Sequence, residues 1–214
     1  MTKVFFTSDH HAGHHNIIKF CDRPFSSVSE MEKALIDNHN SKVNKNDLVY
    51  FLGDVAMGNK QQSLKMFDKL NGQKILVVGN HDNVFGSCDS IKYQKNLPMY
   101  EQYFTTIVHQ IIYKNKELWQ DRIVLDHFPH KQADIQDTEY EVRYKTLRPD
   151  YYVGSLYLHG HTHSKEKISG NHCIHVGVDA WDYTPVSIKQ LREVIEEQGW
   201  YKYSLTSKIK YFFL

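Results

Sequence analysis

The chain has 214 residues, of which 41% are hydrophobic and 24% are charged, and this balance excludes a disordered protein. The formal net charge is +1, from 26 Lys and Arg against 25 Asp and Glu, so no overall charge draws the chain to nucleic acid or to an anionic membrane. No apolar run approaches the ~18 residues that a membrane helix needs. The length predicts a single domain over residues 1–214.

Short apolar runs that end abruptly in polar residues recur along the chain. They cover residues 4–7, 48–52, 75–78, 123–125 and 156–158, and residues 173–178 form a further run. Their length and their near-continuous hydrophobicity predict strands that are covered on both faces.

Helical spacing of apolar residues appears between these strands and after the last of them. The helices expected from it cover residues 29–43, 60–70 and 187–198. Ser29 is expected to cap the first of these helices, with Glu32 completing a capping box. Alternating strands and helices predict a mostly parallel sheet, whose ligands gather beyond the carboxyl ends of the strands.

The second half of the chain has a different pattern. Residues 105–113 and 117–125 flank a short polar segment and predict a hairpin, so part of this half is expected to be antiparallel. Residues 131–152 form a polar insertion rich in Tyr and Arg. The insertion is either a solvated loop or a wall that contacts the substrate.

Three cysteines without close spacing predict reduced thiols and a cytoplasmic protein; they are Cys21, Cys88 and Cys173. An early charged residue, Asp9, argues against a secretory signal. The 14 histidines are clustered, which is typical of a metal site.

Each of the first five predicted strands is followed by side chains of the types that bind metals. The candidate ligands are Asp9, His11, Asp54, Asn80, His127, His161 and His163. Two carboxylates, one amide and four imidazoles suit Mn, Fe, Zn, Co or Ni better than Ca, and manganese is favoured. One catalytic ion does not use seven protein ligands, whereas two ions about 3.5–4 Å apart that share a carboxylate fit this number.

The order of these motifs resembles the calcineurin-like metallophosphoesterase superfamily. The motifs are Asp9-His10-His11, Gly53-Asp54, Gly79-Asn80-His81-Asp82, His127 and Gly160-His161-Thr162-His163. Three shorter phrases resemble short bacterial and phage members: Gly13-His14-His15-Asn16-Ile17-Ile18, Arg23-Pro24-Phe25 and Val176-Gly177-Val178-Asp179-Ala180-Trp181. The resemblance implies an α/β fold with a β-sandwich flanked by helices, mixed sheets and a dinuclear metal site at the C-terminal strand ends.

The resemblance also implies a role for each residue of the site. One metal would be held by Asp9, His11, Asp54 and His163, and the other by Asp54, Asn80, His127 and His161. A hydroxide between the metals would attack phosphorus in line with the leaving oxygen. His81 would protonate the leaving oxygen or steady the transition state, and Asp82 would orient the His81 ring.

Several of these residues have a second interpretation. Asp82 is alternatively a carboxylate that caps its own loop. The residues considered for substrate binding are Asn80, His14 and Arg23, of which His14 is alternatively a structural histidine. His10, His15 and His159 are expected to be structural, and two of them, His10 and His159, should point away from the neighbouring ligands.

We therefore expect a phosphodiesterase or phosphomonoesterase that acts on a small phosphorylated or nucleotide-like substrate. A nuclease is the alternative enzyme, although the near-neutral charge and short length count against a long nucleic-acid track. A non-catalytic interaction module on the same fold is the alternative of another class, and it would need neither His81 nor a complete ligand set.

Overall fold

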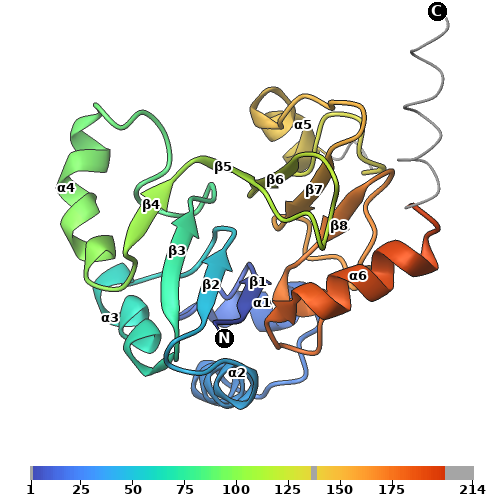
Figure 1. Ribbon diagram of the computed structural model, residues 1–214. Helices are drawn as coiled ribbons and strands as arrows, with labels where there is room; N and C mark the ends of the chain where they lie inside the picture. The colour runs from blue at the N-terminus through green and yellow to red at the C-terminus, as the bar shows by residue number, and fades with distance from the viewer. Residues whose placement is uncertain (1, 136–138, 201–214) are drawn as a thin grey trace, which may run out of the picture.

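A computed structural model describes residues 2–135 and 139–200, and its strands form two mixed sheets (Figure 1). The first sheet has the order β4 (Thr106–Val108), β3 (Gln73–Val77), β2 (Leu48–Phe51), β1 (Val4–Thr7) and β9 (Val186–Ser187). The second has the order β5 (Gln110–Tyr113), β6 (Ile123–Asp126), β7 (Leu156–His159) and β8 (Cys173–His175). Neighbouring strands are parallel except for β9 against β1 and β5 against β6. The expected mixed α/β fold is confirmed, with two sheets in place of one mostly parallel sheet.

Helices flank the two sheets. In chain order they are α1 (His15–Phe20), α2 (Val28–Lys42), α3 (Lys60–Ser63), η1 (Leu64–Lys69), α4 (Ile91–Glu101), α5 (Glu139–Tyr144), η2 (Lys145–Leu147), η3 (Val178–Ala180) and α6 (Ile188–Glu197). The helix expected over residues 60–70 is thus divided into a short α-helix and a 3₁₀ segment. Within the described residues, no helix is long and apolar enough to span a membrane.

Helix α2 begins one residue earlier than the predicted range, and its cap differs from the prediction. Ser27, and not Ser29, accepts a hydrogen bond from the backbone N–H of Glu30, with an N–O distance of 3.2 Å. Glu32 instead accepts a hydrogen bond from the backbone N–H of Gly13, with an N–O distance of 2.9 Å. The capping-box expectation was therefore wrong, because Glu32 ties the helix to the loop that follows β1.

One apolar core lies between the two sheets and another covers the opposite face of the first sheet, which explains why the strands of this sheet are apolar on both faces. Phe6 in β1 points into the core between the sheets together with Leu125 of β6 and Leu191 of α6. Its neighbour Phe5 points to the opposite face, where it packs in the cluster that contains Leu35 of α2. The period-2 alternation of strand side chains thus separates the sandwich core from the helix-covered face.

The predicted hairpin is present only in part. Strands β5 and β6 pair antiparallel, with Tyr113 opposite Ile123, as expected. The run 105–113 does not form one strand, however, because it breaks at His109 and its two halves belong to different sheets. The chain therefore crosses from one layer of the sandwich to the other at this point (Figure 1).

The parallel strands bring their carboxyl ends to one edge of the sandwich. In the first sheet β1, β2 and β3 run in the same direction, and in the second β6, β7 and β8 do so. All the polar motifs of the sequence follow these strands directly. The topology therefore gathers loops that are far apart in sequence into one place.

Candidate metal centre

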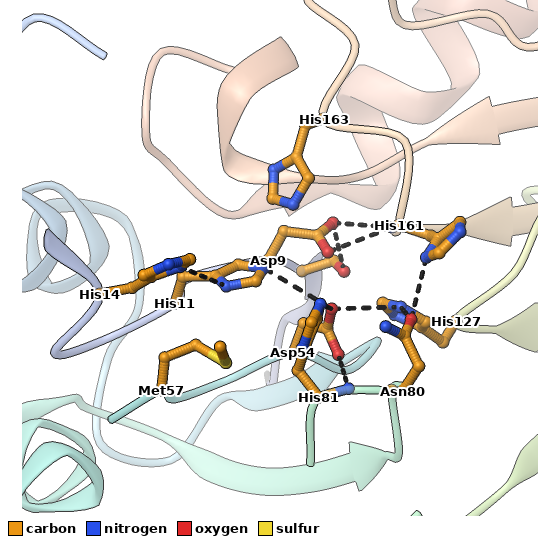
Figure 2. A network of polar contacts seen from close by, with 12 residues as sticks. Asp9, His11, His14, Asp54, Met57, Asn80, His81, His127, His161 and His163 are labelled. Atoms are coloured by element: carbon orange, nitrogen blue, oxygen red, sulfur yellow. Dashed lines mark hydrogen bonds and ion pairs between the residues drawn. The ribbon is translucent and has the colours of Figure 1, made fainter. Parts of the chain in front are cut away.

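Asp54 lies in the middle of the gathered loops (Figure 2). Its Oδ1 accepts a hydrogen bond from the backbone N–H of His81, at 2.8 Å. Its Oδ2 lies 3.6 Å from Nε2 of His11 and 3.5 Å from Nε2 of His127. One carboxylate oxygen thus faces two different histidines, each from a different sheet.

A first group of candidate ligands lies on one side of Asp54. Atoms of Asp9, His11 and His163 that can bind a metal all lie within 4.8 Å of one another. The carboxylate of Asp9 accepts hydrogen bonds from the backbone N–H of His161, at 3.1 and 3.0 Å, and from Oγ of Ser8, at 2.8 Å. The loop after β7 therefore holds the carboxylate that follows β1.

A second group lies on the other side, where Asn80, His127 and His161 meet (Figure 2). Oδ1 of Asn80 lies 2.9 Å from Nε2 of His127 and 3.0 Å from Nδ1 of His161. The Nδ1–H of His127 donates to the carbonyl of Leu52 at 2.7 Å, so a neutral His127 ring has its lone pair on Nε2. That lone pair faces oxygens of Asn80 and Asp54, an arrangement in which a shared cation relieves the repulsion.

The backbone is strained at the same positions. Nine non-glycine residues among those described have a positive φ, and five of them are candidate ligands: Asp9, His11, Asp54, His161 and His163. A residue in this conformation costs about 1–3 kcal/mol and persists where the surrounding structure imposes it, commonly at functional sites. The strain therefore marks the ligand loops independently of their side chains.

Two glycines of the motifs are explained by close packing between loops. A Cβ atom on Gly79 would lie 2.3 Å from Oδ1 of Asp54. A Cβ atom on Gly160 would lie 1.9 Å from Oγ of Ser8 and 2.6 Å from Oδ2 of Asp9. Both contacts are impossible for a side chain, so the glycines allow the carboxylates to approach the neighbouring loops.

The charges of the site fit bound cations. Burial, followed by the nearby charges of Asp82 and Asp9, raises the pKa of Asp54 well above its usual value. Burial likewise lowers the pKa of His11 well below its usual value, and its Nε2 is buried without a hydrogen-bond partner among the described residues. The buried carboxylate of Asp54 beside the imidazole of His11 combines oxygen and nitrogen donors that suit divalent ions of the Mn-to-Zn kind.

The position of Asp82 fits a carboxylate that caps loops and does not fit one that orients His81. Its carboxylate accepts hydrogen bonds from the backbone N–H groups of Asp54 at 3.0 Å, Val55 at 3.2 Å and Gly79 at 2.8 Å. Within the described part of the chain, no hydrogen bond joins it to the ring of His81. Asp82 thus clamps the loops after β2 and β3 together, and the role of orienting His81 does not fit this geometry.

The ring of His81 stands at the open side of the site, with a third of its side chain exposed. Its Nε2 lies 4.0 Å from Oδ2 of Asp54. Burial, followed by the positive charge of Lys60, lowers the pKa of His81 to about 4. The Lys60 ammonium also donates a hydrogen bond to the carbonyl of His81 at 2.7 Å, which fixes the backbone beneath the ring.

The substrate contact expected of Arg23 does not fit its position. Its guanidinium is buried and pairs with Asp179 through Nε–Oδ1 and Nη2–Oδ2 distances of 2.8 Å. Asp179 was not among the residues predicted for the site, and its Oδ2 also lies 2.9 Å from Nδ1 of His163. Its only sequence signal was its place in a phrase shared with short phage and bacterial proteins.

His14 lies beside the first group, with its Nδ1 3.3 Å from Nδ1 of His11. It therefore contacts a candidate ligand, and its contact with substrate stays a prediction, as does that of Asn80. His10 packs against Phe51 and Phe67, away from the site, as expected. His159 is fully buried beside His175, which fits the structural role expected of it.

Among the side chains of the insertion that the structure describes, Tyr144 contributes its aromatic ring to the second group. Tyr144 at the end of α5 meets the ring of His161 edge-on, with a centroid distance of 5.3 Å, and stacks on Phe128 at 5.5 Å. Tyr151 packs instead on Tyr157, and Tyr152 lies under the guanidinium of Arg122. Tyr140 is among the residues whose side chains lie outside the described part.

Comparison with known proteins agrees with these motifs. The family model of calcineurin-like phosphoesterases matches residues 2–165. An uncharacterized protein, MJ1445, of Methanocaldococcus jannaschii is 45% identical over 84 residues; the match covers 38% of this chain and 48% of that protein, about half its length. Gene 66 protein of Mycobacterium phage D29 is 28% identical over 217 residues, covering 92% and 98% of the two chains. Gene 66 protein of Mycobacterium phage L5 is 30% identical over 190 residues, covering 85% and 88%.

One solved structure has the same fold over most of its length. The protein of unknown function AQ665 from Aquifex aeolicus matches with a TM-score of 0.65 and 27% identity, covering 91% of this chain and 100% of that chain. The phage relatives agree with the resemblance to short phage members that the sequence suggested.

Proposed function

The chain belongs to the calcineurin-like phosphoesterase family, and on this premise we propose that it is a metal-dependent hydrolase of phosphate esters that uses two divalent ions. The observation that carries the proposal is Oδ2 of Asp54, which lies 3.6 Å from Nε2 of His11 and 3.5 Å from Nε2 of His127. A carboxylate oxygen between two sets of nitrogen and oxygen donors is the arrangement that a bridging ligand requires.

Each group of donors would hold one ion. The first consists of Asp9, His11, Asp54 and His163, and the second of Asp54, Asn80, His127 and His161. When bound, two such ions lower the pKa of a water molecule toward neutrality and neutralise charge on the phosphate. The chain itself supplies the spacing, because Asp82 clamps the loops of Asp54 and Asn80 to each other.

His81 acts on the substrate side of the site. A pKa of about 4 leaves its imidazole neutral near pH 7, so the ring offers an N–H hydrogen bond in place of a mobile proton. A donor aimed at an oxygen that gains negative charge stabilises the transition state. The negative charge of a bound phosphate would raise the pKa of His81 again. The alternative role, in which His81 transfers a full proton to the leaving oxygen, is therefore the one that the tests must separate from hydrogen-bond donation.

The substrate that we propose is a small phosphorylated or nucleotide-like molecule. The net charge of +1 supports it, because nothing in the overall charge attracts a long polyanion. Manganese is the proposed metal, since the mixture of carboxylate, amide and imidazole donors suits it.

A screen of the manganese-reconstituted protein tests this function. The panel contains an aryl phosphate, an aryl phosphodiester, mononucleotides, cyclic nucleotides, dinucleotides and oligonucleotides. We expect hydrolysis of at least one small ester, insensitive to salt and abolished by EDTA. Asp54→Asn is the inactive control, which separates the activity of this chain from that of a contaminating phosphatase.

Two results would contradict the proposal in different ways. A protein that binds two metal ions and hydrolyses no ester of the panel is an interaction module and not an enzyme. A protein that cleaves only oligonucleotides, with a rate that falls steeply as salt rises, is a nuclease.

A further inference from the structure

The imidazole of His163 contacts a buried ion pair at its Nδ1 edge. Oδ2 of Asp179 lies 2.9 Å from Nδ1 of His163 and 2.8 Å from Nη2 of Arg23. The other carboxylate oxygen, Oδ1, accepts from Nε of Arg23, also at 2.8 Å. The side chains of Arg23 and Asp179 are 0% and 1% exposed, so water does not compete for these bonds.

Arg23 also holds the loop that follows β1. Its Nη2 donates to the carbonyl of Asp9 at 2.8 Å, and its Nη1 donates to the carbonyl of His10 at 3.2 Å. A further contact joins Nη1 to Sδ of Met31 at 3.4 Å. All five N–H groups of the guanidinium therefore have partners inside the chain. A continuous path of hydrogen bonds links the backbone of Asp9 to the ring of His163.

Stability alone does not account for such a pair. Removing two charges from water is costly, and apolar side chains of similar volume commonly serve as well or better. A carboxylate against the outer nitrogen of an imidazole has a specific effect, however, because it sets which ring nitrogen carries the proton. The pair lies where that effect falls on His163, one of three residues whose donor atoms are within 4.8 Å of one another.

We propose that Asp179 is a positioning residue for the first metal, an inference that rests on the two-metal function proposed above. Asp179 accepts the Nδ1–H of His163 and leaves Nε2 as the nitrogen directed at Asp9 and His11 (Figure 2). Arg23 keeps the carboxylate in place through its two-pronged contact.

The effect of Asp179 on metal affinity should be confined to one of the two metal sites. In the second group the outer nitrogen of His127 donates to the carbonyl of Leu52, a neutral acceptor. A carboxylate in this position raises the basicity of the ligand and fixes its orientation, and its loss commonly weakens metal binding by about 10–100-fold. Asp179 should thus govern the affinity of the first site and leave the second unaffected.

Titration of the metal-free protein with Mn²⁺ by calorimetry tests the inference without any substrate. We expect two binding steps in the wild-type protein. Asp179→Asn should weaken one step by about 10–100-fold and leave the other within about twofold. Arg23→Lys keeps the positive charge and loses the bidentate contact with Asp179, so it should weaken the same binding step by a smaller factor.

Asp47→Asn is the matched control for losing a buried carboxylate. Asp47 is 3% exposed and accepts hydrogen bonds from the backbone N–H groups of Lys3 and Asn44, which are no part of the site. Its substitution should lower the melting temperature and leave both Mn²⁺ steps unchanged. Equal weakening of both steps in Asp179→Asn, or no weakening, would overturn the inference.

A measurement on the wild-type protein decides the question even where Asp179→Asn does not fold. Long-range ¹H–¹⁵N spectra of the zinc-loaded protein report which nitrogen of each histidine carries a proton, and His163→Gln assigns the signals. We expect His163 to be protonated at Nδ1 and metal-bound at Nε2. Zinc on Nδ1 of His163 contradicts the positioning role. Failure of the phosphoesterase proposal appears separately, as a wild-type protein that binds metals and hydrolyses nothing.

Discussion

The two halves of the candidate metal centre hold similar ligands by different means. Behind the first half stands a buried charged network, in which Asp179 contacts His163 and is itself held by Arg23. Behind the second half stand a neutral carbonyl and an aromatic ring, since His127 donates to Leu52 and the ring of Phe128 lies 4.7 Å from that of His161. An ion pair thus holds His163 in the first half, whereas a neutral hydrogen bond and aromatic packing hold His127 and His161 in the second.

The difference between an ion pair and aromatic packing predicts which substitutions each half tolerates. A charged network in a buried place depends on every one of its members, because removing one leaves an unpaired charge. An aromatic contact is less specific, and another apolar side chain of similar volume replaces much of it. We therefore expect single changes to be severe and selective in the first half, and mild in the second.

The largest effect should come from the residue that both halves share. Asp54→Asn removes the charge of the proposed bridging carboxylate, so both Mn²⁺ binding steps should weaken together. We expect turnover of an aryl phosphate to fall by on the order of 10³-fold. Calorimetry and initial rates measure the two effects, and a variant that loses only one binding step would show that Asp54 belongs to one half alone.

A change at His81 should lower the catalytic rate and leave metal binding in both halves of the centre unchanged. We expect His81→Ala to lower kcat by about 10²–10³-fold and to leave both Mn²⁺ steps intact. Because the pKa of His81 is about 4, its ring should not titrate between about pH 6 and 8, so the wild-type kcat should show no decline there from this group. His81→Asn, which keeps an N–H donor, should recover part of the rate. A kcat that falls with an apparent pKa near 7 in the wild-type protein, and not in His81→Asn, would favour proton transfer instead.

The smallest effect should come from the packing behind the second half. Phe128 is 3% exposed and contacts the rings of His127 and His161. Phe128→Leu should lower the free energy of unfolding by roughly 1–2 kcal/mol, because an aromatic contact is lost while most of the apolar volume remains. Chemical denaturation measures this loss, and the Mn²⁺ steps should shift by less than about tenfold. A larger and selective loss of the second step would show that the two halves are equally sensitive.

The sequence predicted which candidate ligands lie close together, because these residues follow strands. Runs such as residues 48–52 end in a glycine and a polar side chain, and this transition from buried strand to loop is visible without coordinates. The parallel order of β1, β2 and β3 then requires their polar ends to lie at one edge. Position in sequence was thus sufficient to place Asp9, Asp54 and Asn80 at the same edge of the sheet.

The partners of these ligands were not predictable in the same way. Arg23 and Asp179 are 156 residues apart in the chain, and nothing local to either indicates that they meet. Asp82 had two interpretations in the sequence, and the choice depended on which backbone N–H groups faced its carboxylate. Ser27, and not Ser29, caps α2 because the helix begins at Val28, and Glu32 bonds to the loop after β1.

The sequence by itself determined which atoms are available to bind a metal, because donor chemistry and the strand–loop boundary are local properties. Only the tertiary structure decided which nitrogen of each histidine faces inward and what stands behind it. That orientation depends on hydrogen bonds from other loops, such as those from His163 to Asp179 and from His127 to Leu52. Contacts of this kind form when loops that follow different strands come together in the folded chain, and the order of residues along the chain does not contain them.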